Sequence, residues 1–296
     1  MVGFSILSTM ISSIGFLAVP GFAYKENWRF LGQYASFVFP LIVALVIYIP
    51  YFRNTKVTTA YEFLEKRYGP WARFYTSGII TINQLFFLGT VLYMTSLPIQ
   101  VATGWDIKVI IVFFAIVVAA YTVTGGLRGV ILADVIQGMA LMVAAVIALP
   151  IICHYLPGGL HQVIEQARLD NKMSLGTMEF TLREKGFWVM FISGTMGYLV
   201  VYSTSQTLIQ RYAAPRDIGQ ARKAMLMGTL TYFPMMFYFL FIGTALYVYY
   251  RQFPSEQAAS LKPEQIFPFF ILTKVPTGLR GFIFVGLLAA AMSTLG

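Results

Sequence analysis

Residues 130–152, VILADVIQGMALMVAAVIALPII, decide the fold class of this 296-residue chain. The stretch is long enough to cross the hydrocarbon core of a bilayer as a helix, which takes about 20 residues. It contains one charged side chain, Asp134. Comparable apolar runs recur along the whole chain. They predict eight membrane spans, at 1–24, 34–51, 74–101, 109–124, 130–152, 187–208, 224–250 and 278–296.

The composition agrees with a membrane protein. Apolar residues make up 58% of the chain and charged residues 11%, with a mean hydropathy of +0.71; soluble domains carry about 25% charged residues. The net charge of +9 does not indicate nucleic-acid binding, because the basic residues are scattered and form no patch. The runs are too long and continuous for barrel strands. We therefore expect an all-α, polytopic transmembrane helix bundle in the cell membrane, with 1–296 as a single domain.

The terminal and loop sequences add three expectations. Met1 is followed by no basic region, so no removable signal peptide is expected. The single cysteine, Cys153, excludes an intrachain disulfide. The loops 52–73, 125–129 and 209–223 hold ten Lys and Arg with three acidic residues, whereas the longer loops on the other side hold ten with eight. This density of positive charge predicts that the first set of loops is cytoplasmic.

Asp134 is unusual because the other eleven acidic residues fall in loops between the expected spans. An Asp at the centre of a span costs about 2.5–3.5 kcal/mol on insertion scales, so it requires a partner or a function. One interpretation is an interfacial carboxylate capped by the turn at 125–128. The other is a group that coordinates a cation or carries a proton.

Two spans contain small polar residues and glycine. The first carries STMISSIG at 8–15, and the sixth carries SGTMG at 193–197. Either segment alone is explained by close helix packing. Together they predict interrupted helices at the heads of two five-helix halves, because transporters with inverted repeats coordinate ions through unwound carbonyl groups at such positions.

The last span ends GLLAAAMSTLG at 286–296. Ala290, Ser293 and Thr294 stand at i, i+3 and i+4, so they share one helix face. Two hydroxyls on that face can offer oxygen ligands to a hard cation. The alternative is that each hydroxyl donates to its own backbone carbonyl at i−4.

Four segments together resemble the sodium/solute symporter family, which includes the sodium/glucose cotransporter-like proteins and has the leucine-transporter fold. Their sialic acid symporter-like members are the nearest. The segments occur in order and cover most of the chain: VTTAYEFLEKRYG at 57–69, GGL-x6-D-x2-Q at 125–137, QRYAA-x6-AR at 210–222 and AAAMSTL at 289–295.

The resemblance implies a partial inverted repeat that holds core helices 1 to 8. Residues 1–152 would form the first five-helix repeat, and 187–296 the first three helices of the second. Compared with the family pattern, the chain looks like a fragment truncated at both ends.

The resemblance also implies a sodium site between the broken first core helix and the eighth. Backbone oxygens of Ser8, Ile11 and Ala290 and the hydroxyls of Ser293 and Thr294 would hold the ion. A possible second sodium lies near the carboxylate that matches Asp134. Hydroxyls one turn further along the eighth core helix would also hold that ion. The position after Leu295 is Gly296 rather than a serine, which leaves the second ion open.

The solute site of the family lies at mid-membrane beside the sodium. Phe87 stands where acid-binding relatives, such as the sialic acid symporters, carry an arginine. An anionic solute would lose that charge-assisted partner, so a neutral sugar or polyol is favoured. The positions that match the family's solute lining are Ser12, Gly15, Phe30, Gln33, Phe87, Tyr202 and Gln206.

We expect a sodium-coupled symporter that imports a small organic solute by alternating access, with sodium, the solute and the bilayer as its partners and no nucleic acid. A solute sensor of the same fold, without net transport, is the alternative. An enzyme is not expected, because His154 and His161 have no third metal ligand near them in the sequence and no Ser-His-Asp set appears.

Overall fold

A computed structural model describes residues 2–11, 13–55, 60–180 and 186–295, and every regular element in these ranges is helical. The first half contains α1 (Val2–Met10), α2 (Ser13–Lys25), α3 (Phe30–Ala35), α4 (Val38–Val43), the π-helical turn η1 (Ala44–Tyr48), α5 (Ile49–Asn54), α6 (Ala60–Tyr68), α7 (Pro70–Thr103) and α8 (Ile107–His154). The second contains α9 (Gly159–Leu169), α10 (Phe187–Thr204), α11 (Gln206–Ala213), α12 (Ile218–Gln252), α13 (Glu256–Ser260), the 3₁₀ turn η2 (Pro263–Gln265), α14 (Ile266–Lys274) and α15 (Thr277–Leu295).

Six segments of the described chain are long and apolar enough to cross a membrane: 30–54, 70–100, 107–126, 129–154, 187–204 and 218–252. They correspond to six of the eight expected spans. The first expected span, 1–24, is instead divided into the two short helices α1 and α2, and the last is α15. The all-helical bundle expected from the apolar runs is therefore confirmed.

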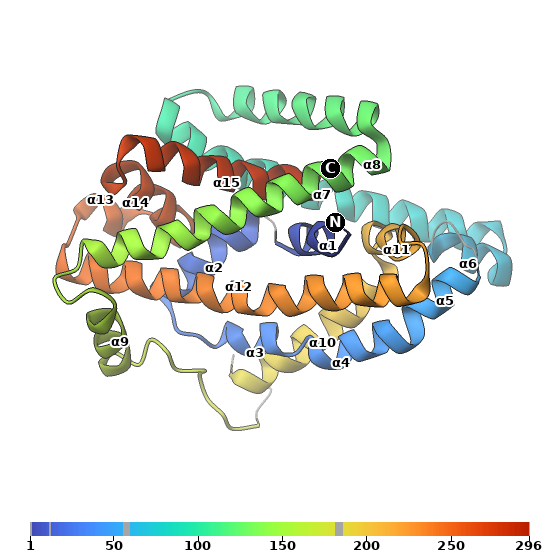
Figure 1. Ribbon diagram of the computed structural model, residues 1–296, viewed down its shortest axis with the longest axis horizontal. Helices are drawn as coiled ribbons and strands as arrows, with labels where there is room; N and C mark the ends of the chain where they lie inside the picture. Colours follow the sequence, from blue (N-terminus) through green and yellow to red (C-terminus); the bar gives the residue numbers. More distant parts are fainter. Residues whose placement is uncertain (1, 12, 56–59, 181–185, 296) are drawn as a thin grey trace.

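The turn expected at 125–128 lies within α8, which doubles back on itself (Figure 1). Gly126 has φ 54° and ψ −165°, a backbone conformation that a residue with a Cβ rarely adopts. This one residue separates the short span that ends at 126 from the span that begins at 129.

α12 is the central element of the bundle. It runs along the length of the molecule and packs against both α1 and α2 (Figure 1). Two glycines allow the close approach: a Cβ on Gly228 would stand 2.7 Å from Ile6 of α1, and a Cβ on Gly243 would overlap the Pro20 carbonyl of α2. Small residues at such crossings are typical of membrane helix pairs. The main apolar core lies along this contact, around Phe16, Phe239 and Phe267.

The two ends of the bundle differ. The ends of α5 and α11 and helix α6 lie at one end, and α9, α13 and α14 lie at the other (Figure 1). By the positive charge of its loops, the α6 end is the one expected to face the cytoplasm.

Candidate functional site

The first membrane helix is interrupted where the sequence predicts it. α1 ends at Met10, the N–H of Ile11 donates to the Leu7 carbonyl at 3.0 Å, and α2 begins at Ser13. The carbonyl groups of a helix's last turn lack intrahelical donors. Ser8 and Ile11 are both buried, so the interruption lies inside the protein. Ser12 lies outside the described residues.

α15 packs against both halves of this broken helix and against α8. The Tyr121 hydroxyl of α8 donates to the Met292 carbonyl of α15 at 2.8 Å, which ties the two helices together near the C-terminal end of α15. The positions 290, 293 and 294 are helical, but their side chains lie outside the described part. The elements that would hold sodium are therefore in contact, and the ligand set itself stays a prediction.

Asp134 is buried in a charged cluster that joins three elements. Its Oδ2 accepts from Arg211 Nη2 of α11 at 2.5 Å and from the Ser5 hydroxyl of α1 at 2.7 Å. Arg211 Nε in turn donates to Ser5 Oγ at 2.8 Å, and its Nη1 donates to the Thr207 carbonyl at 2.9 Å. Asp134 and Arg211 are 1% and 2% exposed, respectively.

This cluster changes the interpretation of Asp134. The carboxylate is buried and is bound by Arg211 and Ser5, two partners that neither interpretation from the sequence named. The intramembrane charge therefore has the partner that its insertion cost requires. A second sodium ion at Asp134 stays a prediction, and any such ion would share the carboxylate with Arg211.

The second helix break lies further along the chain than expected. Residues 193–197 are continuous helix within α10, and the interruption falls at Ser205, whose extended backbone (φ −66°, ψ 112°) separates α10 from α11. Gly194 serves packing instead: a Cβ there would stand 2.7 Å from the Gln33 carbonyl of α3 and would overlap the Ser36 hydroxyl. The expected interruption exists, but SGTMG does not make it.

The expected solute-lining residues are distributed around the two breaks. Tyr202, fully buried, and Gln206 flank the break at Ser205, and Gly15 lies in the first turn of α2 with open space where a Cβ would be. Gln33 packs against Gly194.

Two further members of the set lie away from the breaks. Phe30 stacks on Phe22 with ring centroids 4.6 Å apart. Phe87 of α7 is 40% exposed, so the described residues do not close a pocket around it.

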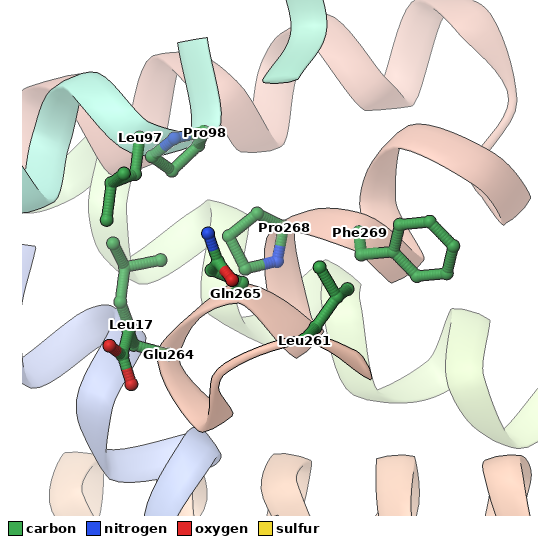
Figure 2. A pocket seen from close by; sticks show the side chains of 8 residues that line it. All are labelled: Leu17, Leu97, Pro98, Leu261, Glu264, Gln265, Pro268 and Phe269. Atoms are coloured by element: carbon green, nitrogen blue, oxygen red, sulfur yellow. The ribbon is translucent and has the colours of Figure 1, made fainter. Parts of the chain in front are cut away.

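A small pocket lies where α2, α7 and the segment around η2 and α14 meet (Figure 2), and none of the expected solute-lining residues lines it. Its volume of about 20 Å³ has room for about one water molecule. The lining is mostly apolar, so we assign it no ligand. It consists of Leu17, Leu97, Pro98, Leu261, Glu264, Gln265, Pro268 and Phe269.

An all-helical membrane bundle with two interrupted helices, one of them packed against a hydroxyl-bearing helix, has the architecture of secondary transporters. The comparison with family models agrees with this class. The chain belongs to the sodium:solute symporter family, whose model matches residues 1–296. It is a multi-pass membrane protein.

Two bacterial relatives and one solved structure are similar over nearly the whole chain. The sodium/sialic acid symporter SiaT of Proteus mirabilis is 32% identical over 99% of this chain and 59% of its own length. NanT of Aliivibrio fischeri, also a sodium/sialic acid symporter, is 30% identical over 99% and 58%. A Na⁺-coupled sialic acid symporter in a substrate-bound outward-open state gives a TM-score of 0.92 at 32% identity, covering 99% of this chain and 62% of that one. The chain thus spans about three fifths of the length of these relatives.

These findings confirm the expected family and its link to sodium, and the relatives are transporters rather than enzymes. The sequence analysis missed Ser5 and Arg211 as site residues. A signal for Arg211 was present, because an Asp within a span requires a partner of opposite charge and Arg211 stands in a family-like segment next to an expected span.

Proposed function

We propose that the protein is a sodium-coupled symporter that imports a small organic solute by alternating access. The observation that carries the proposal is the interruption between the end of α1 at Met10 and the start of α2 at Ser13, beside the buried Ile11, in a helix pair that packs against α15. Such a break supplies carbonyl oxygens, and Ser293 and Thr294 would supply hydroxyls from the facing helix. Family membership supports sodium as the ion.

Coupling would follow from the position of the site between moving elements. Sodium bound by Ser8, Ile11, Ala290, Ser293 and Thr294 would join α1 and α2 to α15. A ligand shifts a conformational equilibrium only through its different affinities for the two states. Each sodium ion that enters contributes about 2.3 kcal/mol per 100 mV of membrane potential, and that energy would drive the solute inward.

Removing one hydroxyl from α15 tests the sodium site. In the protein expressed at full length, Ser293→Ala and Thr294→Ala are each expected to raise the sodium concentration for half-maximal uptake by about tenfold, as for the loss of one charge-assisted contact. Uptake of radiolabelled sodium into vesicles measures this. Thr277→Ala, at the exposed start of the same helix, is the matched control. Unchanged sodium dependence in both variants would remove the two hydroxyls from the site.

For the solute, a neutral sugar or polyol remains our proposal. It rests on Phe87 standing where the resemblance implies an arginine in acid-binding relatives. A carboxylate-bearing sugar such as sialic acid is the second candidate, because the curated relatives are named as sialic acid symporters.

A matched panel of labelled hexose, polyol and sialic acid separates the two candidates. We expect sodium-dependent uptake of a neutral member and little uptake of sialic acid by the natural protein. Phe87→Arg is expected to increase sialic acid uptake by about tenfold, since it restores a cation for the carboxylate. Phe87→Leu is the control. Strong sialic acid uptake by the natural protein would contradict the neutral-solute proposal. Binding of a solute without its accumulation in the vesicles would favour the sensor alternative.

A further inference from the structure

Lys172 binds the C-terminal end of α2, which is the second half of the first broken helix. Its Nζ donates to the carbonyls of Tyr24 at 2.7 Å and of Glu26 at 2.8 Å. The same ammonium lies 4.0 Å from the centroid of the Tyr247 ring of α12, within the range of a cation–π contact. Lys172 is only 9% exposed although it belongs to the loop after α9. One side chain thus joins α2, α12 and the loop.

Arg53 does the same for α11, the second half of the other broken helix. Its Nη1 donates to the carbonyls of Tyr212 at 2.8 Å, Ala213 at 3.2 Å and Pro215 at 2.9 Å, and its Nη2 donates to the Arg216 carbonyl at 3.1 Å. Arg53 belongs to α5, so it fixes the end of α11 to the second membrane helix.

Both contacts place a cationic side chain against the backbone carbonyls at the C-terminal end of a helix. The last carbonyls of a helix have no intrahelical donor, and a cation at a C-terminus also interacts favourably with the helix dipole. Helices α9 and α5 lie at opposite ends of the bundle (Figure 1). Lys172, in the loop after α9, bonds α2, and Arg53 of α5 bonds the end of α11.

A second correspondence links the two contacts. Arg53 is the next-to-last residue of α5, and Arg251 is the next-to-last residue of α12. Arg251 pairs with Asp170, two residues before Lys172, and Tyr247 also donates to Asp170. Arg53, at the end of α5, therefore binds α11 directly. Arg251, at the end of α12, instead binds Asp170 in the loop whose Lys172 binds α2.

We propose that Lys172 and Arg53 are positioning residues that fix the C-terminal ends of α2 and α11. Each of these helices begins at a helix break, and the fixed end keeps it in the orientation in which the break can bind ligands. Burial lowers the pKa of the Lys172 side chain to about 8, which the nearby Asp170 carboxylate opposes. Lys172 thus remains charged at neutral pH. For its consequence on sodium binding, the inference rests on the proposed function.

Hydrogen–deuterium exchange on the full-length protein tests the clamps without any transport. Lys172→Met is expected to speed exchange about tenfold at residues 21–28 while leaving 209–216 unchanged, and Arg53→Met is expected to do the reverse. Lys172→Arg keeps the charge and is expected to remain within about threefold of the natural protein. Arg53→Lys keeps the charge but loses the fork that reaches four carbonyls, so its exchange is expected to lie between that of the natural protein and that of Arg53→Met. The matched controls at the two ends are Lys108→Met and Lys223→Met, both at exposed lysines.

Sodium binding is the second readout, measured as the rise in melting temperature when sodium chloride replaces choline chloride. Lys172→Met is expected to raise the half-saturating sodium concentration about threefold, since a loose α2 must be ordered on binding, and Lys172→Arg is expected to rescue it. Unchanged exchange, equal loosening at both ends in each variant, or unaltered sodium affinity would overturn the proposal. If sodium does not stabilise even the natural protein, the proposed function fails, and the exchange pattern alone decides whether the clamps exist.

Discussion

Replacing Arg211 by methionine is expected to lower the free energy of unfolding by about 3–5 kcal/mol, the range for removing one partner of a buried ion pair. The carboxylate of Asp134 would remain 1% exposed with the Ser5 hydroxyl as its remaining observed donor. Methionine preserves most of the apolar stem of arginine, so the lost charge rather than a cavity dominates. Thermal melts of the purified full-length protein, together with its yield in membranes, measure the effect.

A second substitution at the other partner separates this explanation from a general loss of packing. Asp134→Asn in the Arg211→Met background removes the uncompensated charge, so we expect it to recover about half or more of the lost stability. Arg168→Met, at an exposed position on α9, is the control and is expected to stay within about 0.5 kcal/mol of the natural protein. Equal melting of the single and double Arg211 variants would show that the pair is not what stabilises the junction of α1, α8 and α11.

The Asp134 cluster also shows what could and could not be derived from the chain. The position of Asp134 within an apolar run is visible in the sequence, and a charge there is costly. The existence of a partner for Asp134 could therefore be predicted. The identity of that partner could not be predicted, because Arg211 lies 77 positions away, in the expected loop 209–223. Pairing across that separation depends on how α11 packs beside α1 and α8, which no periodicity encodes.

The two helix breaks give a similar contrast. Small polar residues around Ile11 mark the first break correctly. For the second, the glycines of 193–197 were more conspicuous than the polar residues near Ser205. A glycine in a membrane helix serves either unwinding or close packing, and only the position of α3 beside Gly194 decides between the two.

The loop 153–186 carries α9 and the Lys172 contact with α2. A lysine in a polar loop resembles any solvated charge in the sequence. What distinguishes Lys172 is the burial of its side chain against Tyr247 and the end of α2.

Gly243→Ala is expected to destabilise the protein by about 1–3 kcal/mol, although the same change stabilises many helices by about 0.4–1 kcal/mol. The added Cβ would overlap the Pro20 carbonyl oxygen and stand 2.8 Å from the Ala23 Cβ. These atoms belong to the backbone and to a short side chain, so neither can rotate away, and α2 must shift from α12. Gly197→Ala is the matched control, because a Cβ there meets nothing within 4 Å.

The displacement has a functional consequence that melting alone does not report. α2 begins at Ser13, next to the break that we propose as a source of sodium ligands, and Gly243 contacts the same helix about two turns later. A shift of α2 at Pro20 therefore alters the carbonyl geometry at its inner end. We expect sodium affinity, measured by stabilisation in sodium over choline chloride, to fall in Gly243→Ala and to stay unchanged in Gly197→Ala. A Gly243→Ala protein that melts lower but binds sodium normally would mean that the position of α2 along α12 is not transmitted to the break.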